Sequence, residues 1–163
     1  MNNYKELEIG GISFGLSSGV ITTLAMIIGM SEATGDAKLP IITGILTIAI
    51  ADGLSDALGM YFSEESRLDE QDKSAWIVPL FTFLAKFVFS SIFIIPFLLL
   101  PASLAIYICL AFGIILIISL ASLVARRKKV SLLKEVSKQV FLTVIVISAS
   151  LFIGKISEIL VNR

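Results

Sequence analysis

The sequence IITGILTIAIADGLSDALGMYF, residues 41–62, is an apolar stretch that contains two acidic residues. At a rise of about 1.5 Å per residue, a helix of this length crosses the roughly 30 Å hydrocarbon core of a bilayer. Asp52 and Asp56 lie four positions apart, so a helix presents both on one face, and Met60 continues that face by one turn. A charged side chain near the bilayer centre costs about 2.5–3.5 kcal/mol on insertion scales. The stretch therefore predicts a transmembrane helix whose carboxylates serve an ion pathway.

The composition of the 163-residue chain is typical of a polytopic membrane protein, because 56% of its residues are hydrophobic and its mean hydropathy is +0.96. Its formal net charge of zero gives no reason to expect nucleic-acid binding. The chain has no histidine, so metal or proton chemistry must use carboxylates, methionine, hydroxyls and backbone carbonyls. The sequence contains no nucleophile–base constellation or phosphate loop, and we do not expect an enzyme.

Apolar segments follow one another at about residues 11–30, 41–62, 75–98, 102–124 and 136–161. Lipid offers no hydrogen-bond partners to a bare backbone, so these five segments should be helices. The sequence therefore predicts an all-α integral membrane protein with one membrane domain, located in the cell membrane of a prokaryote or an organelle membrane of a eukaryote.

Basic residues are distributed unequally between the two sides of this predicted bundle. The side that holds the N-terminus carries Lys5, Arg67, Lys73, Arg126, Arg127, Lys128, Lys129, Lys134 and Lys138. The opposite side carries Lys38, Lys155 and Arg163. The positive-inside rule therefore places the N-terminus in the cytoplasm. The basic run that begins at Arg126 is interpreted as a stop-transfer anchor in preference to an interfacial helix that touches anionic lipid.

The first span contains small residues at a strict four-residue spacing, Gly11, Gly15 and Gly19, which allow another helix to approach closely. The second span has its own ridge of small residues beside the two aspartates. If these two helices pack together, Ser18 and Met26 of the first span lie opposite the carboxylates. This arrangement predicts a site of mixed oxygen and sulfur ligands.

Lys86 is a third charge within an apolar segment, and such charges usually pair with one another or line water. An ion pair with Asp52 or Asp56 is a purely structural explanation. Alternatively, Lys86 takes the place of the transported cation when the site is empty. Two aspartates and one lysine leave one negative charge, which must be protonated or attract a cation.

Four motifs in order resemble the vacuolar iron transporter family of iron and manganese transporters. The first span, FGLSSGVITTLAMIIGM (14–30), is similar to the family's FGxxDGxxTTLAxxxG helix, and ADGLSDALGMYFSEES (51–66) to its ADAxSMxxGEYxS signature. IIPFLLLP (94–101) resembles its double-proline turn, and LFIGK (151–155) its closing segment. The resemblance implies a homodimer that exports Fe²⁺ or Mn²⁺ from the cytoplasm in exchange for protons, with no permanently bound cofactor.

The chain departs from this pattern where the family's ligands would lie. Ser18 stands at the position of the family's acidic residue in the first span, Asp56 at that of a methionine and Met60 at that of a glutamate. The family's long cytoplasmic region between the second and third spans is reduced to about a dozen residues. Lys86 does not belong to the family pattern.

We therefore expect a transporter of Fe²⁺ or Mn²⁺ in which Asp56 and Met60 are the main ligands and Asp52 is a ligand or proton carrier. Ser18 and Met26 supply further ligands, Lys86 is the charge partner, and Glu64 and Glu65 attract the cation at the cytoplasmic end. Carboxylate oxygens suit these metals, and a thioether discriminates against Ca²⁺ and Mg²⁺. The alternatives are a membrane scaffold with a structural Asp–Lys pair and a transporter of another cation.

Overall fold

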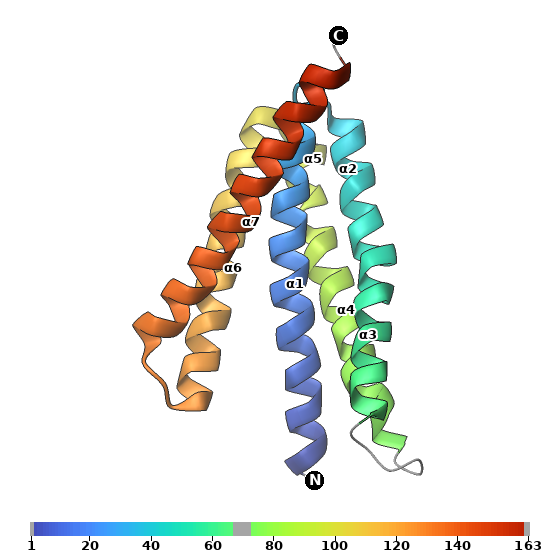
Figure 1. The fold of residues 1–163 in the computed structure, drawn as a ribbon, viewed down its shortest axis with the longest axis vertical. Helices are drawn as coiled ribbons and strands as arrows, with labels where there is room; N and C mark the ends of the chain where they lie inside the picture. Colours follow the sequence, from blue (N-terminus) through green and yellow to red (C-terminus); the bar gives the residue numbers. More distant parts are fainter. Residues whose placement is uncertain (1, 67–72, 162–163) are drawn as a thin grey trace.

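A computed structural model describes residues 2–66 and 73–161 of the chain (Figure 1). Within these residues the structure is helical and contains no strand. The elements are α1 (Asn2–Thr34), α2 (Lys38–Thr47), the π-helical turn η1 (Ile48–Asp52), α3 (Gly53–Glu65), the 3₁₀ turn η2 (Lys73–Trp76), α4 (Ile77–Ile92), α5 (Ile94–Leu99), α6 (Ala102–Lys128) and α7 (Leu132–Val161).

Five helical stretches in the described residues are long and apolar enough to cross a membrane, which confirms the predicted number. They are Lys5–Thr34, Lys38–Glu65, Ile77–Leu99, Ala102–Lys128 and Leu132–Val161. Four of them extend beyond the predicted segments, because the amphiphilic ends of a span continue its hydrogen bonding past the apolar core. The third begins at Ile77, two residues later than predicted, since η2 precedes it.

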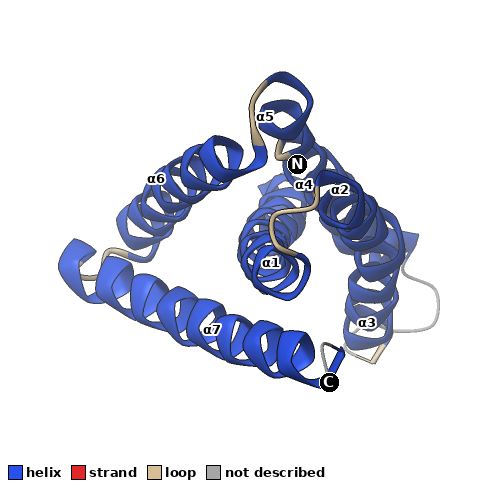
Figure 2. Cartoon of the chain, turned by 90° about the horizontal axis from the view of Figure 1, so that it is seen from above, coloured by secondary structure: helices blue, strands red, loops and turns tan. Residues whose placement is uncertain are grey.

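Helix α1 lies in the middle of the bundle, and the other helices surround it (Figure 2). The N-terminus of α1, the end of α3 and the α6–α7 turn lie at one end of the molecule, and the C-terminus lies at the other (Figure 1). The long helical stretches therefore run alternately up and down the bundle.

The glycine ridge of α1 packs against α4, and the prediction that it packs against residues 41–62 is wrong. A Cβ added to Gly11 would lie 2.5 Å from the carbonyl oxygen of Val78, and one added to Gly15 would collide with that of Thr82. The Thr82 hydroxyl donates a hydrogen bond to the Gly11 carbonyl oxygen at 3.4 Å. Helix α4 takes this place because it offers small and hydroxyl-bearing residues to the ridge.

We expect Gly15→Ala to lower the free energy of unfolding by about 1–3 kcal/mol, because the new methyl group meets the α4 backbone and forces the helices apart. Gly10→Ala is the matched control on the same helix, since a Cβ there meets nothing within 4 Å. It should be neutral or stabilise by up to about 1 kcal/mol through helix propensity. Thermal unfolding in detergent measures both, and equal midpoints would contradict the observed packing.

Helix α7 crosses α1 through a second close contact, which holds the fifth long helical stretch onto the central helix. A Cβ added to Gly154 would lie 2.5 Å from the carbonyl oxygen of Gly29. The Ser150 hydroxyl donates a hydrogen bond to the Ala25 carbonyl oxygen, and Gln139 Nε2 donates one to Ser17 Oγ at 2.6 Å. Small residues and interhelical hydrogen bonds are the usual means by which helices associate in lipid.

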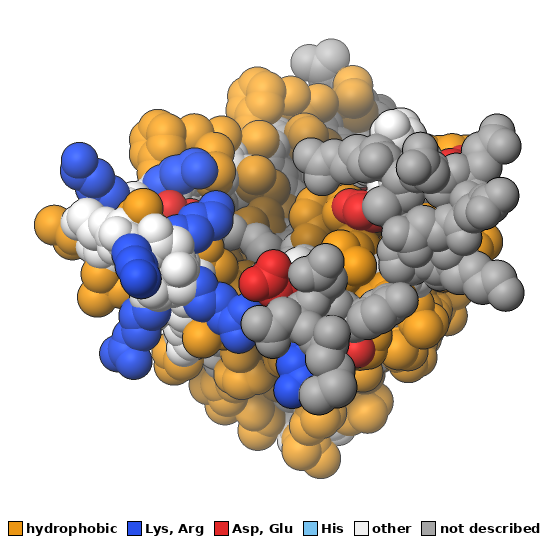
Figure 3. Space-filling model, turned by 90° about the horizontal axis from the view of Figure 1, so that it is seen from below, with side chains coloured by type: hydrophobic (Ala, Val, Ile, Leu, Met, Phe, Trp, Pro, Cys, Tyr) orange, Lys and Arg blue, Asp and Glu red, His pale blue; other side chains and the backbone are white. Residues whose placement is uncertain are grey.

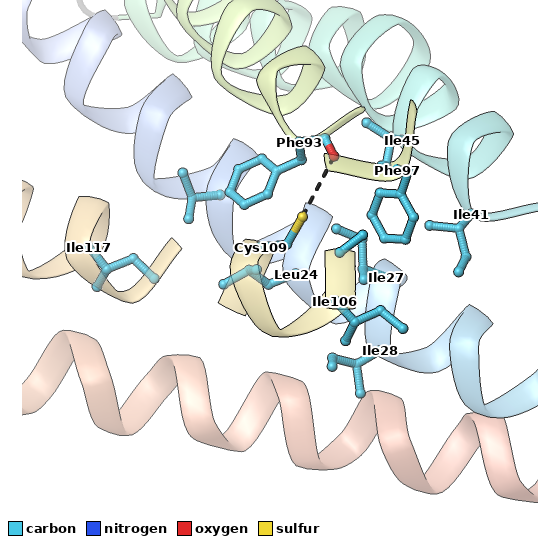
Figure 4. Close-up of a cluster of buried hydrophobic side chains, with 12 residues drawn as sticks. Leu24, Ile27, Ile28, Ile41, Ile45, Phe93, Phe97, Ile106, Cys109 and Ile117 are labelled. Carbon is cyan, nitrogen blue, oxygen red and sulfur yellow. Dashed lines mark hydrogen bonds between the residues drawn. The ribbon is translucent and has the colours of Figure 1, made fainter. Parts of the chain in front are cut away.

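The third long helical stretch, Ile77–Leu99, is interrupted at Phe93, between α4 and α5. Phe93 and Phe97 are buried in the hydrophobic core with residues of α1, α2 and α6, and the Cys109 thiol donates a weak hydrogen bond to the Phe93 carbonyl oxygen at 3.6 Å (Figure 4). The sequence predicted a turn from Pro96 to Pro101, but Pro96 lies inside α5. Proline is tolerated in the first turn of a helix, where its missing N–H is not needed. The turn is confined to Leu100 and Pro101.

Candidate functional site

Three charged side chains meet between α1, α4 and the junction of η1 with α3. Lys86 Nζ lies 2.6 Å from Asp52 Oδ2 and 2.5 Å from Asp56 Oδ2. The ammonium also donates a hydrogen bond to Ser18 Oγ at 3.1 Å, and the Ser18 hydroxyl donates one to Asp56 Oδ2 at 2.7 Å. Three oxygen atoms from two elements of the second span and from α1 therefore surround one cationic nitrogen. We call these four residues the carboxylate cluster.

Glycines make room for the carboxylate cluster. A Cβ on Gly19 would lie 3.1 Å from Lys86 Cγ, so the missing side chain admits the lysine stem between α1 and α4. Gly53 lies against the ring of Phe83, where an added Cβ would be 3.3 Å from the ring, and this brings α3 close to α4. The ridge residues predicted from sequence thus serve the site by letting helix backbones approach.

The π-helical turn η1 ends at Asp52, directly before α3 begins. In this turn the N–H of Gly53 bonds to the carbonyl oxygen of Ile48, five residues back, instead of the usual four. Such a turn inserts an extra residue and rotates the helix that follows, and π turns are frequent at functional sites. Here the turn sets the direction in which the two carboxylates leave the helix.

The cluster is closed on one side and open on the other. The side chain of Lys86 is 0% exposed, whereas those of Asp52 and Asp56 are 41% and 23% exposed. The ammonium is thus sealed inside the bundle, and the carboxylates lie between it and the surface of this chain. Two carboxylates and one ammonium leave one formal negative charge, which no structural ion pair within the cluster balances.

The structure brings together four of the residues that the sequence singled out: Ser18, Asp52, Asp56 and Lys86. It places Met26 elsewhere, because Met26 lies two helical turns, or about 12 Å, from Ser18 along α1. The thioether of Met26 packs against Gly44 of α2, where an added Cβ would lie 3.1 Å from the methionine methyl group. Its sulfur fills space beside the hydrophobic core, as methionine commonly does.

The other predicted site residues lie further along α3. Met60 is partly buried one turn after Asp56, on the face that the spacing predicted. Glu64 is partly buried, and Glu65 is exposed and accepts a hydrogen bond from the Tyr61 hydroxyl at 2.9 Å. The acidic end of α3 therefore leads toward the carboxylate cluster along one helix.

Helix α4 has a polar face that was not predicted from the sequence. Thr82, Lys86 and Ser90 are all 0% exposed, and each follows the last by four positions. The Ser90 hydroxyl donates a hydrogen bond to the Gly19 carbonyl oxygen at 3.4 Å, so the two hydroxyls fasten α4 to α1 on either side of the lysine. This four-residue spacing was the signal that could have identified α4 as the partner of α1.

In residues 2–66 and 73–161, no three side chains of histidine, cysteine, aspartate or glutamate converge as a metal-binding group. A cation at the carboxylate cluster would have the two aspartates and the Ser18 hydroxyl as its protein ligands. Comparisons with protein-family models, with curated proteins and with solved structures find no match.

Proposed function

We propose that the five long helices cross a membrane, with the N-terminus in the cytoplasm. The support comes from the outward faces of the helices, which carry large apolar side chains that are exposed among the described residues. On the second span, Ile50, Leu54, Leu58 and Phe62 are 48–63% exposed and follow one another at four-residue spacing. Such continuous apolar surface is rare on soluble proteins and is normal for helices that face lipid.

Within this membrane domain we propose a cation pathway through the carboxylate cluster. The observation that carries the proposal is the position of Lys86 Nζ, which sits within 3.1 Å of three oxygens of Asp52, Asp56 and Ser18. The ammonium occupies the place that a transported cation would take. Because the aspartates are partly exposed while the lysine is not, a cation reaches the carboxylates without first passing Lys86.

The proposed cargo is a divalent transition metal, Fe²⁺ or Mn²⁺. A divalent cation neutralises both carboxylates, which the single charge of Lys86 does not, so charge favours the exchange once Lys86 moves away. Met60 supplies a thioether one turn from Asp56, and Glu64 and Glu65 attract the cation to the end of α3. Carboxylates must be ionised to bind metal, so the proton that balances the remaining negative charge of the empty cluster leaves when metal loads, and we propose proton-coupled export from the cytoplasm. The resemblance of the first and second spans to iron transporters supports this cargo.

We further propose that the protein acts as a homodimer. Asp52 is 41% exposed in one chain, and a carboxylate exposed to that extent is costly against hydrocarbon. A second copy that covers this face, or water held between two copies, removes the contact with lipid.

The test is metal flux into proteoliposomes that contain the purified protein. We expect Mn²⁺ and Fe²⁺ to cross faster than in protein-free liposomes, and Ca²⁺ and Mg²⁺ to cross at the protein-free rate. A proton gradient across the liposome membrane should accelerate metal transport in the direction opposite to proton flow. Flux equal to that of protein-free liposomes for every cation would refute the transport proposal.

A second candidate function is that of a membrane scaffold whose Asp–Lys cluster is structural. Complete burial of Lys86, with two carboxylates within 2.6 Å, is the observation that favours it. In a scaffold the ion pairs fix the register between α3 and α4 and never open. The two functions differ in what happens when the lysine is removed.

A further inference from the structure

Six exposed basic side chains gather at the turn between α6 and α7. They are Arg126, Arg127, Lys128, Lys129, Lys134 and Lys138. The only acidic side chain in this stretch is Glu135, which is partly buried. Within the residues that the structure describes, none of the six forms an ion pair with another side chain. Their charge is therefore available to a partner outside this chain.

The backbone of the turn keeps a lysine where a glycine would fit more easily. Lys129 has φ 53° and ψ 35°, the left-handed conformation that commonly ends a helix. Its N–H bonds to the carbonyl oxygen of Arg126 at 3.4 Å, and the N–H of Val130 bonds to that of Ala125 at 3.1 Å. Glycine is the usual residue here because L-amino acids are strained in this conformation. A lysine at this position adds a positive charge to the turn but leaves the backbone in a strained conformation.

Apolar side chains lie among these charges and are equally exposed. Val130 is 49% exposed, Leu132 50% and Leu133 78%. Basic side chains next to exposed leucines suit the boundary between lipid headgroups and acyl chains. At this boundary the basic groups contact phosphate and the apolar groups enter the hydrocarbon. A soluble acidic partner would complement the charges but leave the leucines without a contact.

The position of the turn in the bundle agrees with this depth. The α6–α7 turn ends short of the N-terminal end of α1, so it lies nearer the middle of the bundle than that end does (Figure 1). Seen from this end, the basic side chains gather on the side of the molecule that holds the turn (Figure 3). With the five helices in a bilayer, this position brings the cations of the turn closer to the hydrocarbon than the N-terminal end of α1.

We propose that the α6–α7 turn binds the phosphate headgroups of anionic phospholipids, with Leu133 among the acyl chains. The proposal rests on membrane insertion of the five helices, and it is independent of metal transport. The turn recognises a phosphate group that is joined to acyl chains. Free inorganic phosphate lacks the acyl chains and therefore does not displace the lipid.

The experiment uses a fluorescent reporter within the turn. Trp76 is the single tryptophan of the chain, so a Trp76→Phe, Leu133→Trp variant has its only indole at the turn. The variant is reconstituted in phosphatidylcholine bilayers that contain brominated phosphatidylglycerol or brominated phosphatidylcholine at equal mole fraction. We expect the anionic lipid to associate with the turn at least about five-fold more strongly, the effect of roughly one cation at a membrane surface. The preference should shrink at 1 M salt, where the Debye length is about 3 Å, and persist in inorganic phosphate at matched ionic strength.

Matched variants assign the preference to the turn. Arg126→Gln, Arg127→Gln and Lys128→Gln together should bring the ratio of the two lipids to about one, whereas Lys38→Gln with Lys155→Gln, at the other end of the molecule, should leave it unchanged. If the triple variant does not fold, Glu135→Gln alone should raise the ratio by removing the opposing charge. Equal quenching by the two lipids, or a preference that survives neutralisation, overturns the lipid site alone. Absence of quenching by either lipid overturns the placement of residue 133 among the acyl chains, whether or not the five helices are inserted.

Discussion

Asp56→Asn is expected to lower Mn²⁺ flux in proteoliposomes by ten- to hundred-fold. Asp56 is the one residue of the carboxylate cluster that contacts both Lys86 and Ser18, through the same oxygen. An amide in its place keeps the shape but removes the negative charge that would hold a metal ion. Hydrogen bonds to charged groups contribute about 1.5–3 kcal/mol, and that loss corresponds to the expected change in flux.

The Asp56→Asn variant should still fold, because Lys86 keeps its ion pair with Asp52 and the cluster becomes neutral. Asp36→Asn is the matched control, since Asp36 lies outside the long helices and accepts a hydrogen bond from Ser31. An asparagine accepts the same bond and tolerates the left-handed backbone of Asp36 (φ 64°), so flux should not change. Mn²⁺ flux at the wild-type rate in the Asp56→Asn variant would show that Asp56 is not part of the pathway.

Lys86→Met is expected to bind Mn²⁺ at least about ten-fold more tightly than the wild type. Methionine keeps an unbranched side chain in the space beside Gly19 but carries no charge, so the metal no longer competes with an internal cation. The uncompensated aspartates take up a proton or a metal ion in the empty site. Added Mn²⁺ should therefore raise the thermal midpoint of the variant more than that of the wild type.

A structural cluster predicts the opposite result for Lys86→Met. Removing one partner of a buried ion pair lowers the free energy of unfolding by about 3–5 kcal/mol, and metal would not restore it. Lys155→Met is the matched control, because Lys155 pairs with Glu32 at 3.7 Å and is 63% exposed. Exposed pairs contribute about 0–1 kcal/mol, so this control should change neither stability nor metal binding. A destabilised Lys86→Met protein that Mn²⁺ does not rescue would favour the scaffold.

Hydropathy predicted the number and order of the five long apolar helical stretches, because the length of an apolar run and the cost of a bare backbone in lipid are local properties. Pairing between helices is not local. Glycines at positions 11, 15 and 19 predicted a close helix contact but did not identify the partner helix. In the structure the partner is α4, whose Thr82 and Ser90 hydroxyls donate hydrogen bonds to α1.

The convergence of Ser18, the aspartates and Lys86 was predictable because charged side chains in apolar segments usually form ion pairs with one another. The position of Met26 was not, since a thioether packs as readily against the core as it binds a metal. The π turn before Asp52 has no sequence signature of its own.

Anomalous scattering from crystals of the protein soaked in Mn²⁺ tests most directly whether a cation replaces Lys86. We expect a peak between the carboxylates of Asp52 and Asp56, with the ammonium of Lys86 moved away from both. Crystals that bind no Mn²⁺ there, with Lys86 still held between the two carboxylates, would contradict the proposed pathway.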